Sequence, residues 1–197
     1  MRNKTPIIYK ISRGILGPLF RIYYNPKIIG KENIPESGRV VIASNHIHVY
    51  DQCPIIISTK RPISYMAKKE YFDSIFTRWF FKGSGCISVD RYGDPSDAVK
   101  EALDVLDNDG ALGIFPEGTR NKTKEFLQPF KFGAVSMAKR TDSYILPVGV
   151  TGTYKFRSRD LTIRIGTPFK ISDMKLEDAN DKLFNEIKTL MEKNLHQ

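Results

Sequence analysis

One stretch, residues 39–52 (RVVIASNHIHVYDQ), constrains the fold of this chain more than any other. It begins with an apolar, β-branched run that is typical of a buried strand, and it turns abruptly polar at Asn45 and His46. Functional groups in α/β folds gather at the carboxyl ends of strands, so we place His46 at such an edge. Asp51 follows five residues after His46, and on a regular helix that step rotates a side chain by about 140°. A turn must therefore separate the two residues if the carboxylate is to reach the imidazole ring.

The rest of the chain alternates short apolar runs with segments of helical periodicity. We expect further strands at 63–67, 86–89, 111–115, 144–150 and 161–165, and helices at 55–59, 95–107, 132–140 and 173–195. The alternation within 161–165 indicates an edge strand, and Ser172 is a suitable N-cap for the last helix. This order predicts a single α/β domain with a mixed, largely parallel sheet flanked by helices, and 197 residues suit one such domain.

An N-terminal amphipathic helical segment, residues 1–26, precedes the predicted domain at 27–197. Residues 5–24 repeat apolar side chains at helical spacing, with basic residues mostly opposite, and Gly17 with Pro18 is where such a helix would break. The helix either packs on the core or lies in the interface of an anionic membrane. No continuous apolar stretch reaches the roughly eighteen residues of a membrane span. If this segment meets a membrane, it lies on the surface.

The net charge indicates which kind of partner to expect, and the cysteine content indicates the cellular compartment. The formal net charge of +9 favours an anionic partner, and without a recognised nucleic-acid motif we expect a membrane surface with anionic lipids and no nucleic acid. Two cysteines and no secretory signal favour a reduced, cytoplasmic compartment. Residues 71–81 carry seven large apolar side chains, which predicts a helix that is either buried nearly all round or turned toward lipid.

Several common kinds of site lack their sequence marks. The chain has no G-x-S-x-G elbow, which argues against a serine hydrolase. It also has no G-x-G-x-x-G and no P-loop, which argues against a Rossmann dinucleotide site and a P-loop nucleotide site. His46 and His48 form a His-x-His pair, but a metal would need carboxylates such as Asp51 to complete its shell. We therefore expect no metal site.

Four signals at strand ends occur in order: SNHIHVYD at 44–51, GCISVDR at 85–91, FPEGTR at 115–120 and LPVGV at 146–150. Together they resemble the glycerolipid acyltransferase family, in particular its bacterial PlsC-type 1-acylglycerol-3-phosphate acyltransferases. The resemblance spans about residues 25–170. It implies an enzyme of phospholipid biosynthesis that moves an acyl chain from acyl carrier protein or coenzyme A to the sn-2 hydroxyl of lysophosphatidic acid, giving phosphatidic acid.

The resemblance also assigns roles to the residues of the first motif. His46 would be the general base that removes the proton of the acceptor hydroxyl, and Asp51 would hold the ring in the correct tautomer. No cofactor is implied beyond the acyl thioester, which is a co-substrate. His48 stands where the family often has Ser or Asn, which bears on the choice of acceptor.

By the same resemblance, the substrate-binding positions are Lys68, Arg91, Glu117, Gly118, Thr119 and Arg120. Arg120 would clamp the acceptor phosphate with paired hydrogen bonds, aided by backbone and hydroxyl donors from the Gly-Thr pair before it. Glu117 would orient Arg120 or accept from a substrate hydroxyl, or the two would form only a structural ion pair. Lys68 and Arg91 would contact phosphate or carrier, with Lys69 beside Lys68 as an equal candidate for the inward position.

The expected place of work is the cytoplasmic face of the cell membrane, where the chain would be a peripheral, monotopic protein. Two alternatives stay open. The acceptor is another lysophospholipid or a lyso-aminolipid, or the chain is a non-catalytic, basic membrane-binding module. Lys155, Arg157 and Arg159 either dock an acidic carrier protein or belong to a solvated loop.

Overall fold

The computed structural model describes residues 6–90 and 93–196. Its helices are α1 (Ile7–Tyr24), α2 (Gln52–Ile56), α3 (Glu70–Asp73), α4 (Arg78–Gly83), α5 (Ser96–Asp107), α6 (Gly133–Arg140) and α7 (Leu176–Leu195), with a 3-10 turn η1 (Lys31–Asn33). Its strands are β1 (Lys27–Ile29), β2 (Val40–Ser44), β3 (Ile63–Lys68), β4 (Ile87–Val89), β5 (Ala111–Ile114), β6 (Tyr144–Thr151) and β7 (Thr162–Ile165).

All of these strands join one sheet in the order β1-β7-β6-β2-β5-β3-β4. Strands β6, β2, β5, β3 and β4 run parallel to one another, whereas β7 is antiparallel to β6 and β1 runs parallel to β7. The predicted mixed, largely parallel sheet is confirmed. Because β2 lies between β5 and β6, the carboxyl ends of these three strands meet at one edge.

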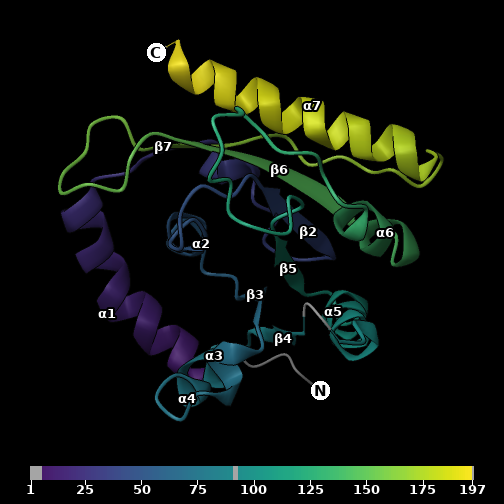
Figure 1. Ribbon diagram of the computed structural model, residues 1–197, viewed down its shortest axis with the longest axis horizontal. Helices are drawn as coiled ribbons and strands as arrows, with labels where there is room; N and C mark the ends of the chain where they lie inside the picture. Colours follow the sequence, from purple (N-terminus) through teal and green to yellow (C-terminus); the bar gives the residue numbers. More distant parts are fainter. Residues whose placement is uncertain (1–5, 91–92, 197) are drawn as a thin grey trace.

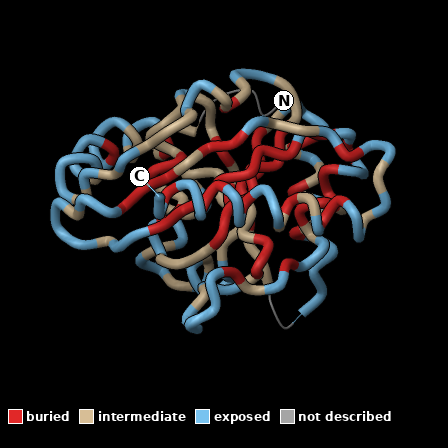
Figure 2. The backbone as a smooth tube through the Cα atoms, turned by 90° about the horizontal axis from the view of Figure 1, so that it is seen from above, coloured by how far each residue is buried: buried red, intermediate tan, exposed pale blue. Residues whose placement is uncertain are grey.

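Helices cover both faces of the sheet (Figure 1). The side chains of β2 alternate between the two layers, as a strand dictates: Val41 and Ala43 pack in the core under α5, α6 and α7, whereas Val40 and Ile42 pack in the core that reaches Ile55 of α2. Figure 2 shows these strands as the buried centre of the molecule. Burying each large side chain of this kind stabilises the fold by about 1.5–3 kcal/mol.

Strand β7 is not the edge strand that its alternation predicted. It lies between β1 and β6, with Ile28 opposite Ile163 in the parallel β1 ladder. Thr162 and Ile163 are both buried because both faces of β7 are covered. Helix α7 covers one face, where Asn194 accepts a hydrogen bond from Arg164, and the core that reaches Ile55 covers the other. The three-residue β1 is the edge instead.

Helix α1 runs unbroken through Pro18, so the predicted break is wrong. A proline ring inside a helix crowds the carbonyl of the residue four positions earlier. Here that residue is Gly14, and the side chain of Pro18 is itself exposed. The helix continues because contacts on both sides of Pro18 hold it: Tyr9 donates to the carbonyl of Arg61, and Tyr24 packs against Tyr154.

The prediction of a single helix at 71–81 is also wrong, and so is the alternative that its side chains are buried nearly all round. The segment forms α3 and α4, which are separated by a turn that begins where Ser74 adopts an extended backbone. Ile75, Phe76 and Trp79 point outward, with exposed fractions of 79%, 85% and 62%. Ser172 does not cap α7 either. Its hydroxyl donates to Asp142, and the helix begins later, at Leu176.

Candidate active site

The end of β2 is fastened to β6 by the side chain of Asn45. Its amide nitrogen donates to the carbonyl of Val150 at 2.9 Å, and its amide oxygen accepts from the N–H of Val150 at 2.7 Å. Asn45 is buried, so both bonds are shielded from water. The backbone that enters the His46 loop is therefore held against the neighbouring strand.

His46 and Asp51 form a hydrogen-bonded pair. Nδ1 of His46 lies 2.8 Å from Oδ2 of Asp51, and a tight loop between β2 and α2 brings the two together, as the spacing predicted. The same oxygen accepts the backbone N–H groups of Ile47 and His48, each at 2.7 Å. Asp51 is fully buried, and these donors stabilise its negative charge without water.

The pair leaves one nitrogen of His46 free for chemistry. An ionised carboxylate only accepts hydrogen bonds, so Nδ1 of His46 carries the proton and Nε2 is the unprotonated, basic nitrogen. The side chain is 15% exposed, which leaves a narrow opening to the ring. Phe115 stacks on the imidazole with ring centroids 4.0 Å apart and planes 12° apart, so the ring orientation is fixed from its face as well.

Glu117 supports the backbone of His46. Its Oε1 accepts from the N–H of His46 at 2.7 Å, and its Oε2 accepts from the N–H of Gln128 at 3.1 Å. The carbonyl of His46 accepts in turn from Asn121 at 2.7 Å. Burial raises the pKa of Glu117, and the two backbone donors only partly oppose that shift. Across the described ranges, no ion pair joins Glu117 to Arg120.

The remaining FPEGTR residues form a turn with an exposed end. Gly118 has φ +71°, donates its N–H to Phe115 at 2.9 Å, and leaves room for Lys131, which an added Cβ would approach at 2.9 Å. Thr119 and Arg120 are exposed, and in residues 6–90 and 93–196 neither has a hydrogen-bonding or ionic partner. The predicted phosphate clamp is thus a free guanidinium beside the His46 loop.

Two adjacent lysines lie at the end of β3. Lys68 lies 4.0 Å from Glu70 and is half-exposed. Lys69 donates to Asp90 at 3.0 Å, and that bond raises the pKa of Lys69. Lys68 is therefore the less constrained lysine. Arg91 lies outside the described residues.

Tyr154 carries no sequence motif, and the fold brings it into the site. Its hydroxyl donates to Oδ1 of Asp51 at 2.8 Å, and its ring stacks on His48 at 4.3 Å. His48 thus packs on Tyr154. Its pKa is lowered mainly by burial and further by the charge of Arg120. Tyr154 follows the carboxyl end of β6, which the LPVGV signal had marked, and that position is the one clue that could have suggested it.

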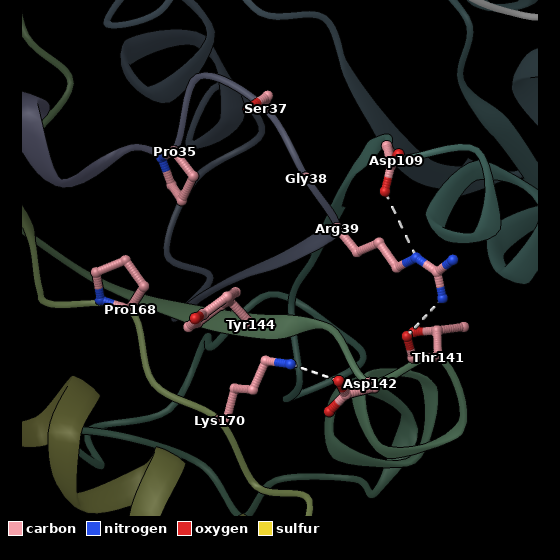
Figure 3. A pocket seen from close by; sticks show the side chains of 10 residues that line it. All are labelled: Pro35, Ser37, Gly38, Arg39, Asp109, Thr141, Asp142, Tyr144, Pro168 and Lys170. Atoms are coloured by element: carbon pink, nitrogen blue, oxygen red, sulfur yellow. Dashed lines mark hydrogen bonds and ion pairs between the residues drawn. The ribbon is translucent and has the colours of Figure 1, made fainter.

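A hollow of about 560 Å³ lies at the opposite edge of the sheet, where β2 and β6 begin (Figure 3). Its charged groups are paired with one another: Arg39 lies 3.6 Å from Asp109, and Lys170 donates to Asp142. It shares no residue with the His46 site. Among the described residues, no three His, Cys, Asp or Glu side chains are grouped to hold a metal ion. None of the described helices has the length and apolarity needed to cross a bilayer.

Comparison with known proteins identifies the family. The Acyltransferase family model matches residues 25–151. The 1-acyl-sn-glycerol-3-phosphate acyltransferase of Borreliella burgdorferi is 33% identical over 141 residues, which are 71% of this chain and 56% of that protein. A Bacillus subtilis protein of the same name is 28% identical over 181 residues, 89% of each. The crystal structure of PlsC, the 1-acyl-sn-glycerophosphate (LPA) acyltransferase of Thermotoga maritima, matches all of this chain and 85% of its own, with TM-score 0.76 at 20% identity, and so has the same fold. This chain belongs to the acyltransferase family.

Proposed function

We propose that the chain transfers an acyl group from a thioester to the free sn-2 hydroxyl of lysophosphatidic acid, forming phosphatidic acid for phospholipid biosynthesis. The observation that carries this proposal is the hydrogen bond from Nδ1 of His46 to the buried carboxylate of Asp51. The names of the relatives support the choice of reaction, above all that of the Bacillus subtilis protein, which aligns over 89% of both chains. Residues 27–197 form the acyltransferase domain in this proposal, and residues 1–26 associate with the membrane.

The chemistry requires a base but no protein nucleophile. Nε2 of His46 takes the hydroxyl proton as the alkoxide oxygen attacks the thioester carbonyl, and the same proton then passes to the sulfur as the carbon–sulfur bond breaks. Asp51 stabilises the imidazolium in between. Burial raises the pKa of Cys53, close to Asp51, to about 12, so this thiol is not available as a thiolate. Acyl transfer is therefore direct, from acyl carrier protein or coenzyme A to the acceptor.

The acceptor phosphate binds at Arg120. Its exposed guanidinium stands near His48, and nothing in the described chain neutralises it. The hydroxyl of Thr119 and the ammonium of Lys68 are further donors for the phosphate, and Arg91 is a further contact by its position in the third motif. A zwitterionic acceptor would add a positive charge to this basic region, so an acidic headgroup is favoured.

We infer that the chain works on a membrane surface, at the cytoplasmic face where acyl thioesters are made. α1 exposes a row of apolar side chains with exposed fractions above 50%: Ile7, Ile11, Ile15, Leu16, Leu19 and Ile22. Ile8 of α1 packs against Gly83 of α4, so the two helices are in contact, and Trp79 of α4 and Phe76 just before it are exposed as well. A patch of this extent with basic residues around it suits the interface of an anionic bilayer.

The catalytic proposal is tested by acyl transfer to lysophosphatidic acid from acyl-coenzyme A and from acyl carrier protein, in detergent micelles. His46→Ala should lower kcat by about 10²–10⁴, the usual contribution of a positioned base, whereas His196→Ala at the far end of α7 should leave it unchanged. Equal rates for wild type and His46→Ala would contradict the mechanism. A faster reaction with lysophosphatidylcholine would favour another acceptor, and no thiol release at all would favour the non-catalytic alternative.

The membrane proposal is tested with the fluorescence of Trp79, which is the chain's one tryptophan. Vesicles that contain phosphatidylglycerol should shift its emission to shorter wavelength as the indole leaves water. Phe76→Ser should weaken the binding, whereas Tyr144→Ser, at the opposite edge of the sheet, should not. An unchanged spectrum at saturating anionic lipid would contradict membrane contact through α4.

A further inference from the structure

We propose that Tyr154 is a positioning residue for acyl transfer, which sets the basicity of His46 by sharing the carboxylate of Asp51. The inference rests on the proposed function. Its hydroxyl donates to Oδ1 of Asp51 at 2.8 Å, whereas His46 uses Oδ2 at 2.8 Å. Tyr154 comes from the loop after β6 and is 103 positions from Asp51 in the chain.

The two oxygens of Asp51 are unequally bound. Oδ2 accepts from the imidazole of His46 and from the N–H groups of Ile47 and His48. Oδ1 accepts from Tyr154, its one partner within residues 6–90 and 93–196. Because Asp51 is fully buried, Oδ1 lies out of contact with bulk solvent. Tyr154 therefore controls how much of the carboxylate charge is left for His46.

Contacts on both sides hold Tyr154 in this position. One face of its ring stacks on His48 at 4.3 Å and 16°, and its edge packs against Tyr24 of α1 at 5.6 Å. Further along the same loop, the N–H of Arg157 donates to the carbonyl of Tyr23 at 2.6 Å. The loop is thus anchored to the C-terminal end of α1, and the phenol is aimed at Asp51 before any substrate arrives.

The effect on the base has a definite sign. A phenol that donates to Asp51 withdraws negative charge from the carboxylate, so the carboxylate stabilises the imidazolium of His46 less. Without that donor, the carboxylate would keep more of its charge for the protonated ring of His46, and a lower proton concentration would be needed to free the base. Burial and the charge of Asp51 raise the pKa of Tyr154, so the phenol keeps its proton throughout the working range. The other titratable groups that face this pair come from several parts of the chain and stay unchanged in the test: His48, Cys53, Tyr65, Glu117 and Arg120.

The test measures kcat and KM for lysophosphatidic acid from pH 5 to 9 in wild type and Tyr154→Phe. In Tyr154→Phe, the fall of kcat at acid pH, its acid limb, should begin at a higher pH than in wild type. A displacement of one pH unit would lower kcat about tenfold at every pH below that range. The loss should disappear above the limb, and KM should stay within about twofold, because the phenol does not touch the phosphate site. Tyr24→Phe is the matched control, since it removes a hydroxyl from the same aromatic cluster without touching Asp51.

A second substitution protects the test against misfolding. Replacing Tyr154 by 3-fluorotyrosine keeps the shape of the ring and strengthens the donor, so the acid limb should move to lower pH, opposite to Tyr154→Phe. Unshifted limbs, or losses that are equal at every pH, would overturn the role of Tyr154 in an enzyme that is otherwise active. A wild type without acyl transfer under any condition would instead refute the proposed function on which this role depends.

Discussion

The carboxylate of Glu117 and the backbone N–H of His46 are joined by a hydrogen bond of 2.7 Å. The other oxygen of the same carboxylate accepts the N–H of Gln128. One buried side chain thus connects the loop after β5 to the end of β2. In the described structure it supports the backbone of His46 and forms no ion pair with Arg120.

Glu117→Gln should destabilise the fold. The new side-chain amide keeps one oxygen that can accept a hydrogen bond, but its NH₂ group replaces the other oxygen and faces a backbone N–H. One buried backbone N–H therefore loses its acceptor, at a cost of about 1–3 kcal/mol. Urea unfolding measures the loss, with Glu186→Gln on the exposed face of α7 as the control that should change little. A stability equal to wild type would mean that the carboxylate is not bound as described.

The difference in stability between wild type and Glu117→Gln should also depend on pH. Burial raises the folded-state pKa of Glu117 above its unfolded value. The folded state therefore holds the proton more tightly, and the stability from this group is fully present below the unfolded pKa and declines as pH rises through the folded pKa. Unfolding experiments from pH 4 to 7 should show wild type losing stability relative to Glu117→Gln as pH rises. A difference that grows with pH would contradict the direction of the shift.

Asn45→Ala should destabilise the fold by about 2–4 kcal/mol, since it removes two buried hydrogen bonds and leaves both backbone groups of Val150 without their side-chain partner. Because the amide holds the entry to the His46 loop, kcat should fall as well. Asn185→Ala, on the exposed face of α7, is the control, and helix propensity makes it neutral or slightly stabilising. Denaturant unfolding and acyl-transfer rates check the prediction. Equal stability of Asn45→Ala and Asn185→Ala would contradict it.

Gly17 lets α1 approach α2 closely, because an added Cβ would lie 3.1 Å from Cγ2 of Ile57. Gly17→Leu should therefore push α1 away from α2 and destabilise the protein by roughly 1–3 kcal/mol, the usual cost of overpacking. Gly14→Leu places the same side chain on the same helix in open space and should cost nothing. Thermal unfolding of the two variants distinguishes them, and equal melting temperatures would show that α1 does not depend on this contact.

Arg120→Ala should raise KM for lysophosphatidic acid about 10- to 100-fold, because a charge-assisted bond to phosphate contributes about 1.5–3 kcal/mol. Arg120→Lys should recover part of the loss, since it restores the charge without the paired donors. Arg140→Ala on α6 is the control, and steady-state kinetics at fixed thioester supply the measurement. A fall in kcat with KM unchanged would move Arg120 from phosphate binding to another step.

The sequence predicts features that depend on neighbouring residues. The buried run of β2, the turn from His46 to Asp51 and the strand that leads to Glu117 all follow from short patterns, and each is found in the structure. The parallel sheet follows from the order of the elements. The amphipathic α1 was also predicted, although it continues through Pro18.

Features that depend on distant parts of the chain were missed. β7 is internal because the short β1 returns to pair with it from more than a hundred residues away. Tyr154 reaches Asp51 across a similar separation and carries no motif. Composition indicates that residues 71–81 are apolar, but it does not locate the turn at Ser74 that directs Phe76 outward.

The bond from Tyr154 to Asp51 also bears on how relatives of this chain are classified. The family match ends at residue 151, before the loop that carries Tyr154. Two chains that match equally well over that range can share the histidine and the aspartate and still differ in what donates to the second carboxylate oxygen. Sorting acyltransferases by the pH at which they work will therefore require the loop after β6 to be compared along with the motifs.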